Sequence, residues 1–490
     1  MSAVFARFTI GQWRVSIAPF SRVQAEPPRH LGCSESEGQS TRMLSRAEAR
    51  DRAVALVERA RRHGADAADA VYSADGSESV QVRLGKLEDV ERSESEHIGL
   101  RAFVGQRSAS IGSSDLSDAA LDELAARAVA MARLAPEDPY AGLAPRDRLG
   151  DGIGPELDLE DVTEPSPEQL RCVAAEVEDA ARAVPGVTNS EGGSASAGRS
   201  VFALATSEGF AGAYGATSHN LSASVIAGEG GDMQRDYAWR ATRHREDLPS
   251  AEAIGTQAGE RTTARLHPGR VKSGPLPVVF DPRVGGSLIG HLVSAMSGPS
   301  IARRASFLLD RLDEQFFDSA IVVAEEPHRP RALRSRPFDG EGLPTSARNL
   351  VEDGKVTGWL MDSASARQLG LAPTGHASRG HGGAPGVSTG NVHLAAGSQT
   401  PAELMADIVE GIYVTELIGQ GVNGVTGDYS RGASGFRIIK GELAGPVAEF
   451  TVAGNLLEMF RAMVPANDLE WHRAINVPTV RIDGMTIAGD

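Results

Sequence analysis

The expected fold of the C-terminal part is decided by residues 411–436, which read GIYVTELIGQGVNGVTGDYSRGASGF. Seven of these 26 residues are glycine, and they alternate with β-branched residues around one polar stretch. A mixture of strand-forming and turn-forming residues predicts a hairpin or meander. Asn423 and Gly424 both tolerate a positive φ, so they predict a tight hairpin turn. The polar residues that follow predict a second turn or a bulge.

The same segment also matches a nucleotide-binding pattern. Gly419, Gly421 and Gly424 have the spacing G-x-G-x-x-G after a strand-like stretch. A phosphate-binding glycine turn must open a helix, whose N-terminal amides face the anion. Residues 426–432 contain more glycine and lack the apolar spacing of a helix. The hairpin is therefore favoured, near an edge strand to which an extended peptide could add its backbone.

Length and charge limit the classes of function that fit this chain. Its 490 residues are enough for two or three domains with substantial cores. Lys and Arg number 49 against 65 Asp and Glu, which gives a net charge of −16 and argues against nucleic-acid binding. No window approaches the roughly 20 continuous apolar residues that span a bilayer. We expect a soluble protein that does not bind membranes.

The chain contains two cysteines, Cys33 and Cys172. They lie far apart and form no C-x-x-C pair, so neither a disulfide framework nor a thiolate metal site is expected. This usage fits the reducing cytoplasm, which is the predicted location. Cys172 lies among Val173, Ala174 and Val177 in a predicted helix, so we expect a small buried side chain without a chemical role.

The order of helical and strand-like stretches predicts an α+β protein with two smaller α+β units and a large, mainly β, C-terminal domain. Residues 1–42 lack the apolar run of a secretory signal and are interpreted as an N-terminal extension, either disordered or upstream of a native start at Met43. A transit-like peptide is the alternative. The expected parts after it are an N-terminal α+β domain, a linker, a central α+β domain and a β-rich C-terminal domain, at 43–135, 136–165, 166–268 and 269–490.

Local signals place the helices and strands of these parts. Capping residues, apolar residues at helical spacing and terminal glycine or proline predict helices at 45–62, 117–134, 167–184, 250–266, 284–296, 401–409 and 454–463. In the first unit, alternating apolar and polar residues predict short antiparallel strands with polar or glycine breaks between them, at 70–73, 79–84, 97–104 and 108–111.

Three long motifs give the chain a resemblance to the TldD/PmbA family, once labelled modulators of DNA gyrase, and within it to the PmbA or TldE branch. The motifs are residues 411–436, AGNLLEMF at 453–460 and GPSIARRASFL at 298–308. The resemblance covers about residues 44–490. It implies a cytoplasmic zinc-protease complex made of a TldD and a TldE subunit, which acts on unfolded peptides.

The resemblance also implies where the TldD branch binds its metal. There, a helix carries H-E-x-x-x-H, whose histidines bind zinc and whose glutamate is the general base, and a cysteine near the C-terminus is a further ligand. The corresponding residues here are Gly286, Ser287 and His291, and the last twenty residues contain no cysteine. We therefore expect no metal and no catalytic residue in this chain, and zinc in the partner subunit. His291 is expected to be a packed helix residue, with a metal or substrate role as the alternative.

Two other sets of residues could carry chemistry. His376, His381 and His393 are numerous enough for a metal site, but a flexible loop without a neighbouring carboxylate favours solvent-facing histidines. Three acidic residues have no identifiable acid/base partner and are interpreted as solvated charges, namely Glu325, Glu326 and Glu442.

The polar residues of the opening segment are candidates for a peptide-binding surface or a partner interface, namely Asn423, Asp428, Tyr429, Ser430 and Arg431. On a structural interpretation, Asp428 and Ser430 satisfy turn amides and Arg431 pairs with a carboxylate. On a functional interpretation, this turn lines a peptide channel or contacts the partner.

Together, the residues and the resemblance predict the non-metal subunit of a two-subunit metalloprotease. Such a subunit would complete the substrate chamber and position an unfolded peptide beside the zinc of a TldD-like partner. The alternatives are a stand-alone regulatory or peptide-binding protein and a metallopeptidase that uses unrecognised ligands.

Overall fold

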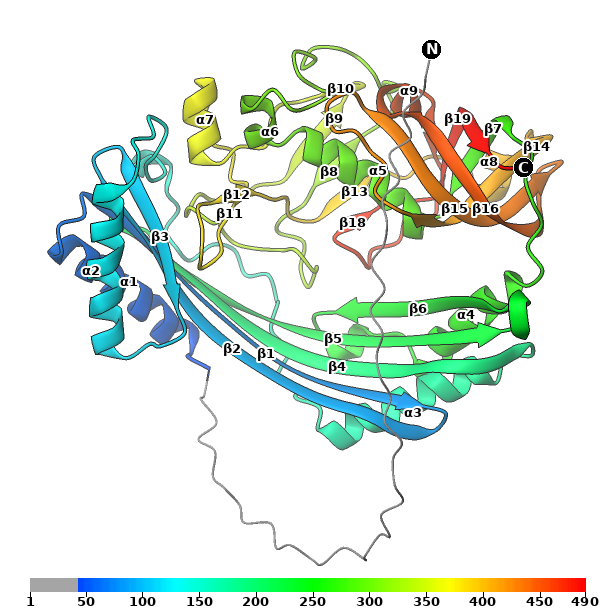
Figure 1. Cartoon of the computed structure of the whole chain (residues 1–490), viewed down its shortest axis with the longest axis horizontal. Coiled ribbons are helices and arrows are strands. Elements are labelled where there is room, and N and C mark those ends of the chain that lie inside the picture. Colours follow the sequence, from blue (N-terminus) through cyan, green and yellow to red (C-terminus); the bar gives the residue numbers. More distant parts are fainter. Residues whose placement is uncertain (1–42) are drawn as a thin grey trace, which may run out of the picture. The chain divides into compact units, whose positions relative to one another are not determined.

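The computed structural model describes residues 43–490, and the interpretation of residues 1–42 lies outside them. The first half of the described chain is built on an antiparallel sheet of six strands in the order β3-β2-β1-β4-β5-β6 (Figure 1). Its elements are α1 (Arg46–Arg62), β1 (Ala67–Arg83), β2 (Lys86–Val104), β3 (Arg107–Ser113), α2 (Asp118–Leu134), η1 (Arg146–Arg148), α3 (Pro167–Arg182), β4 (Val187–Thr206), β5 (Ala211–Ala227), η2 (Gly230–Asp232), β6 (Gln234–Thr242), η3 (Arg245–Asp247) and α4 (Ala251–Ala264). Pairing of β1 with β4 joins the two smaller α+β units into one sheet.

Alternation of side chains along β1 explains how the sheet is covered. Ala70, Tyr72, Val80 and Val82 all point to the same face of the sheet. Ala70 and Tyr72 pack with α1 and α2 there, and Val80 and Val82 pack with α3 and α4. The two helix pairs accordingly cover opposite ends of one face (Figure 1). On the other face, Val71 belongs to a cluster that includes Phe338 from the C-terminal half.

The helices of this half are confirmed, with small shifts at their ends. α1 begins after Ser45, whose side chain forms a capping box with Glu48. α3 begins after Ser166, whose side chain forms a capping box with Gln169. Serines at 117 and 250 cap α2 and α4. Local capping chemistry is therefore sufficient to place these starts.

The predicted breaks between the first strands are wrong. β1 is a single strand of 17 residues that includes Gly76 and Ser77, and β2 includes the mainly polar residues 86–96. Gly76 pairs with Glu94 on one side and with Arg199 on the other. Pairing with two neighbouring strands outweighs the weak preference of glycine and serine for other conformations.

The C-terminal half is rich in β-strands, which confirms the predicted α+β class. Its elements are β7 (Gly274–Phe280), α5 (Pro282–Ala295), α6 (Gly298–Ala302), β8 (Val323–Glu325), β9 (Arg348–Glu352), β10 (Lys355–Val356), α7 (Ser363–Leu369), β11 (Ala377–Ser378), β12 (Gly386–Val387), β13 (Val392–Leu394), α8 (Pro401–Met405), β14 (Glu410–Ile418), β15 (Asp428–Ile439), β16 (Glu442–Asn455), α9 (Leu456–Arg461), β17 (Met463–Pro465), β18 (Ile475–Asn476) and β19 (Val480–Ala488). The strands β16-β15-β14-β7-β19 close into a barrel because β16 also pairs with β19. A second sheet, β10-β9-β8-β13-β18, shares its hydrophobic core.

The segment that opened the sequence analysis forms the antiparallel strands β14 and β15 of the barrel. The predicted two-residue turn at Asn423 and Gly424 is wrong. The Asn423 side chain instead accepts hydrogen bonds from the next two amides after Gly424, at 2.9 and 3.3 Å. The chain reverses over six residues between Val422 and Tyr429, which form a bridge, and the positive φ in this turn falls on Gly427.

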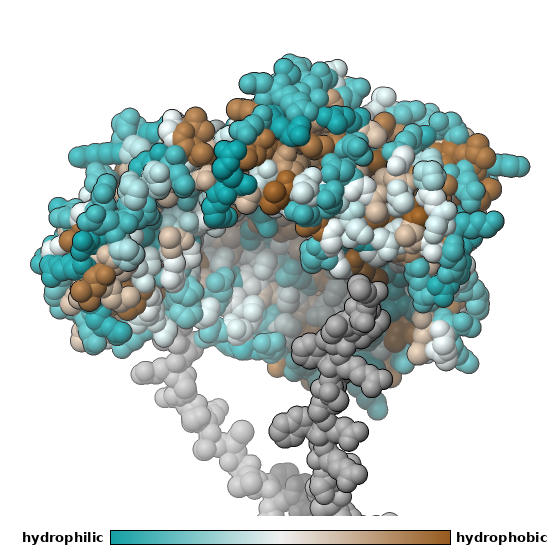
Figure 2. All heavy atoms as spheres, turned by 45° about the horizontal axis from the view of Figure 1, so that its top comes forward, coloured by the Kyte–Doolittle hydropathy of each residue, from teal (hydrophilic) through white to brown (hydrophobic). Residues whose placement is uncertain are grey.

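Among residues 43–490, the apolar side chains visible in Figure 2 lie in small groups among hydrophilic ones. Large exposed apolar side chains such as Leu134 and Val162 belong to different segments. Within residues 43–490, no helix is long and apolar enough to cross a membrane.

Candidate functional site

A cleft lies beside α5, the helix that carries positions 286, 287 and 291. Asp281 caps this helix by accepting a hydrogen bond of 2.9 Å from the Arg283 amide. The cleft has a volume of about 370 Å³ and lies where β6 of the first sheet meets α5 and the barrel strands β14 and β15. We call it the arginine cleft, and its lining residues are Arg235, Asp236, Tyr237, Arg265, Arg283, Val284, Ser287, Thr415, Glu416, Leu417 and Arg431.

Three of the four arginines in this cleft form ion pairs. Asp236 accepts hydrogen bonds from both terminal nitrogens of Arg283, at 2.8 and 2.9 Å, and from Arg265 at 3.3 Å. Arg265 also contacts the carboxylate of Glu416. Burial raises the pKa of Asp236, but the two guanidinium groups outweigh burial and lower it, so this carboxylate is ionised at neutral pH. Arg235 pairs with a glutamate of β4 at 3.0 Å.

Arg431 is the exception among these arginines. Its Nη2 donates a long hydrogen bond of 3.4 Å to the carbonyl of Leu417. It forms no ion pair with any residue of 43–490, and its buried Nε has no hydrogen-bond partner there. The hydroxyl of Thr415, a residue that is 7% exposed, also lacks a partner in the described part of the chain. The predicted pairing of Arg431 with a carboxylate is therefore wrong, and two residues of the cleft have unsatisfied polar groups.

His291 lies one helical turn beyond Ser287 and packs against the strand that carries Arg431. Its ring meets the Tyr429 ring edge-on, with 6.2 Å between the ring centres. Burial, and secondarily the charge of Arg431, lower the pKa of His291, so the imidazole is neutral at neutral pH. Burial raises the pKa of Tyr429 to about 12, and nearby Arg431 opposes this rise. The geometry between Arg431 and the Tyr429 hydroxyl is not that of a hydrogen bond, and this hydroxyl has no partner within residues 43–490.

The residues of α5 do not fit a zinc ion. Gly286 has no donor atom, and a Cβ at this position would lie 3.3 Å from the carbonyl oxygen of Ile475. The Ser287 hydroxyl donates a hydrogen bond of 2.7 Å to the carbonyl of Val284. Among residues 43–490, no group of three or more His, Cys, Asp or Glu side chains is arranged to hold a metal ion.

The three C-terminal histidines considered as an alternative metal site do not come together. His376 is 3% exposed rather than solvent-facing, and its Nε2 lies 2.7 Å from a carboxylate oxygen of Glu325. Glu325 is itself buried, so its interpretation as a solvated charge is wrong, as is the expectation that these histidines lack a carboxylate neighbour. His381 stacks on a histidine of β2 at 4.4 Å, and His393 packs against Trp471 at 4.5 Å.

Of the five polar residues expected to contact peptide or partner, Arg431 lines the arginine cleft. Asn423, Asp428 and Ser430 are exposed on the turn and the start of β15, away from the lining of the cleft. The Asp428 carboxylate accepts a hydrogen bond of 2.6 Å from a threonine hydroxyl two residues earlier. Tyr429 is buried beneath them, 2% exposed. The structure thus separates this set into one cleft residue, one core residue and three surface residues.

The prediction that Cys172 is buried is wrong. The buried face of α3 is formed by residues that include Leu170, Ala174 and Val177, and position 172 lies outside that face. Cys172 is exposed, and its sulfur lies 3.8 Å from a carboxylate oxygen of Glu168.

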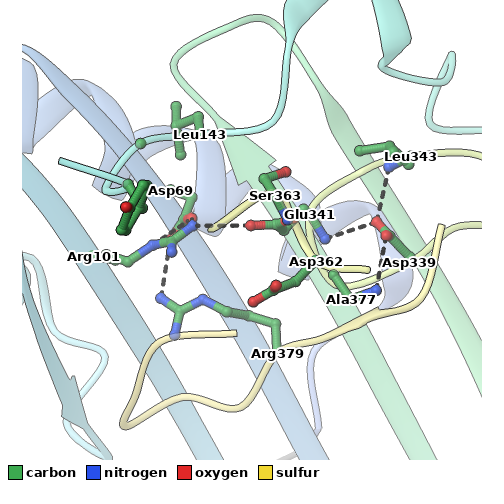
Figure 3. Close-up of polar contacts among 12 residues, drawn as sticks. Asp69, Arg101, Leu143, Asp339, Glu341, Leu343, Asp362, Ser363, Ala377 and Arg379 are labelled. Carbon is green, nitrogen blue, oxygen red and sulfur yellow. Dashed lines mark hydrogen bonds and ion pairs between the residues drawn. The ribbon is translucent and has the colours of Figure 1, made fainter. Parts of the chain in front are cut away.

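A second group of charged residues lies where the sheet meets the C-terminal half (Figure 3). Asp69 on β1 accepts hydrogen bonds from Arg101 on β2 and from Arg379, each at 2.9 Å. Glu341 approaches Arg101 from the other side, at 3.8 Å. We call this group the Asp69 cluster, and its members are at most 6% exposed, namely Asp69, Arg101, Asp339, Glu341, Asp362 and Arg379.

Two acids of this cluster, Asp69 and Glu341, have opposite pKa shifts. Burial raises the pKa of Asp69, but Arg101 and Arg379 outweigh burial and lower it. Burial raises the pKa of Glu341 to about 7, although Arg101 opposes the rise. The Glu341 carboxylate also accepts a hydrogen bond of 2.8 Å from the amide of Ser363 at the start of α7.

Sequence reasoning missed the Asp69 cluster. Asp69 and Arg379 are 310 residues apart, so no local pattern relates them. The one available signal was a charged residue between Ala68 and Ala70 in a strand whose neighbours are apolar.

The fold defines a known class of protein. A crystal structure from Bacteroides thetaiotaomicron VPI-5482, of a protein provisionally named a modulator of DNA gyrase, matches with a TM-score of 0.84 and 26% identity, and the match covers 91% of this chain and all of that one. TldE from Thermococcus kodakarensis has the same fold, with a TM-score of 0.77 at 19% identity over 89% of this chain and all of that one. The chain therefore has the fold shared by these two structures.

The sequence comparisons define the family. Sequence models of the PmbA/TldA metallopeptidase match domain 1 at residues 68–132, the central domain at 160–266 and the C-terminal domain at 273–489. Metalloprotease PmbA of Escherichia coli O157:H7 is 39% identical over 86% of this chain and 92% of that protein. The metalloprotease PmbA homolog of Haemophilus influenzae is 35% identical over 89% of this chain and 94% of that protein. The chain belongs to the TldD/PmbA family of metallopeptidases, as its motifs predict.

Proposed function

We propose that this chain is the TldE-type subunit of a two-subunit TldD/TldE-type zinc metalloprotease, and that it does not itself hold the zinc. The observation that supports this most is the composition of α5. Gly286, Ser287 and His291 offer one imidazole, whereas catalytic zinc sites use three protein ligands. The cleft beside them supports a retained role in handling the peptide.

In this proposal, the chain completes the substrate chamber and positions an unfolded peptide beside the zinc of a TldD-like partner in the cytoplasm. The zinc of the partner would polarise the scissile carbonyl and activate water. The residues of this chain would bind and orient the peptide and exclude bulk solvent. The use of only two cysteines supports the cytoplasmic location.

The test is reconstitution from purified subunits. The full chain alone and mixed with a TldD-type subunit is incubated with an unfolded polypeptide, while co-elution and bound zinc are measured. We expect hydrolysis in the mixture only, co-elution of the two chains, and zinc in the partner only. Failure to co-elute would favour a stand-alone regulatory or peptide-binding protein, the function suggested by the gyrase-modulator name of one structural relative. One equivalent of zinc on the isolated chain would favour a metallopeptidase with unrecognised ligands.

A further inference from the structure

The arginine cleft supports an inference about the substrate, which rests on the proposed function. We propose that the cleft binds a carboxylate of an extended peptide through the guanidinium of Arg431 and the hydroxyl of Thr415. The carboxylate comes either from an aspartate or glutamate side chain or from the C-terminus of the peptide.

The pairing of charges singles out Arg431. The cleft is lined by four arginines and by two acids, in a chain whose net charge is −16. Asp236 and Glu416 are already occupied by Arg265 and Arg283. Arg431 has only the 3.4 Å hydrogen bond to a backbone carbonyl and no acidic partner within residues 43–490. An anion that enters the cleft therefore finds one uncompensated guanidinium.

The unsatisfied atoms indicate what the anion contributes. A buried polar group without a hydrogen-bond partner destabilises the folded protein, and a ligand that supplies the partner recovers that loss. In the part of the chain that the structure describes, the Nε of Arg431 and the hydroxyl of Thr415 are both buried and have no hydrogen-bond partner. Both residues line the cleft, from adjacent strands β15 and β14. A bound carboxylate would accept from both.

The donor set fits a carboxylate better than a phosphate. A planar guanidinium binds the two oxygens of a carboxylate side by side, and one hydroxyl can add a further hydrogen bond. A phosphate dianion carries more charge and a third oxygen, so it would draw on further cations. Arg265 and Arg283 are held by Asp236, which is 3% exposed, and are not free to contribute.

A second hollow borders the arginine cleft and could bind the residues of the peptide that lie next to the carboxylate. It has a volume of about 520 Å³, lies over β4, β5 and β6, and shares Arg235 and Tyr237 with the arginine cleft. Tyr237 is 42% exposed, and Trp239 lines the same hollow two residues further along β6. A peptide with its carboxylate at Arg431 can therefore lay neighbouring apolar residues on these two rings.

Calorimetry on the full chain tests this proposal with three acetylated hexapeptides of leucine and alanine. The first contains one glutamate and has an amidated C-terminus, the second has no acid and a free C-terminus, and the third contains glutamine and is amidated. We expect the first or the second to bind at least about tenfold more tightly than the third, because a charge-assisted hydrogen bond is lost in the third. The stronger of the two identifies the source of the carboxylate. Equal affinity for all three peptides would overturn the proposal.

Two arginines of β15 provide a matched pair of variants. Arg431→Gln should reduce the affinity for the carboxylate peptide to that of the neutral peptide, and Arg431→Lys should restore part of it. Arg437→Gln is the control, because Arg437 is also half-buried on β15 but donates to the carbonyl of Arg270 and does not line the cleft. Circular dichroism confirms that each variant is folded. Full affinity in Arg431→Gln, or an equal loss in Arg437→Gln, would overturn the proposal.

The same variants separate this inference from the proposed function. If mixtures with a TldD-type subunit cleave an unfolded polypeptide and Arg431→Gln cleaves acidic and neutral peptides in the wild-type ratio, the carboxylate site is wrong and the proposed function stands. If no mixture cleaves, the proposed function fails, and calorimetry on the isolated chain still decides whether the carboxylate site exists.

Discussion

The Asp69 cluster and the arginine cleft both gather arginines in a protein of net charge −16, and they differ in what completes them. In the cluster, Asp69 accepts hydrogen bonds from both Arg101 and Arg379, so each of these arginines has an acidic partner, although the buried Nε of Arg379 has no hydrogen-bond partner within residues 43–490. In the cleft, both acids pair with Arg265 and Arg283, and Arg431 has no acidic partner among the described residues, where its Nε is also without a hydrogen-bond partner. The placement of carboxylates, rather than of arginines, therefore distinguishes a structural contact from a site open to a ligand.

The largest effect on stability is expected from a substitution of Asp69 in the cluster. Asp69→Asn removes the one carboxylate that both buried arginines share, and breaking a buried ion pair leaves uncompensated charge. We expect a loss of about 3 to 5 kcal/mol in the free energy of unfolding, measured by urea denaturation. Asp75→Asn on the same strand is the control, because Asp75 is exposed and should change stability by less than about 0.5 kcal/mol. Equal effects at the two positions would contradict a structural role for the cluster.

The second prediction concerns Glu341 of the Asp69 cluster, whose raised pKa should make the free energy of unfolding depend on pH. Its pKa is raised from 4.5 to about 7 in the folded protein, so the folded state binds the proton more tightly than the unfolded state does. The stabilisation from this proton is complete below about pH 4.5 and is lost as the pH rises through 7, a change of about 3 kcal/mol. Glu341→Gln should match the wild type near pH 5 and exceed its free energy of unfolding at pH 8, as measured by denaturation at both values. A constant difference between the two proteins across this range would contradict the raised pKa.

Arg431 should behave in the opposite way to Asp69. Arg431→Gln removes no ion pair formed within residues 43–490, so we expect the free energy of unfolding to change by less than about 1 kcal/mol. Urea denaturation beside Asp69→Asn measures the contrast directly. A loss as large as that of Asp69→Asn would make Arg431 a structural residue and remove the distinction between the two regions.

The smallest effect is expected from rebuilding the metal motif on α5. Gly286→His combined with Ser287→Glu restores the letters H-E-x-x-x-H, but the last twenty residues still contain no cysteine to supply a third ligand, and a Cβ at position 286 would lie 3.3 Å from the carbonyl oxygen of Ile475. We expect the double variant to retain less than stoichiometric zinc after dialysis, measured by elemental mass spectrometry. A TldD-type subunit carried through the same dialysis shows that bound zinc survives the procedure. One equivalent of zinc in the double variant would show that α5 needs only these side chains to hold the metal.

Features that depend on neighbours in the sequence could be predicted. Ser45 with Glu48 starts α1, because a capping box forms within one helical turn. The strands on either side of the glycine-rich turn were also predicted, since β-branched residues flank turn residues there. The motif positions on α5 were placed on the correct helix for the same reason.

Features that depend on distant partners could not be predicted. Gly76 stays in β1 because strands on both sides pair with it, through Glu94 on the next strand and through Arg199, which lies more than 100 residues further along the chain. The buried contact of His376 with Glu325 joins residues 51 positions apart, so each looked like a solvent-facing residue. A carboxylate partner for Arg431 was expected on the structural interpretation of its segment, and only the three-dimensional arrangement shows that the nearby acids pair with other arginines.

The pairing of β1 with β4 has a consequence for synthesis of the chain on the ribosome. Asp69 aligns with Thr206 and Val82 with Gly193, so one edge of β1 stays unpaired until translation has passed residue 206. Until then, the nascent N-terminal unit exposes backbone amides and carbonyls along this strand, and such an edge readily pairs with another copy. A fragment that ends at residue 135 keeps this edge permanently open, so it should aggregate during expression, whereas a fragment that extends through β6 should remain dispersed.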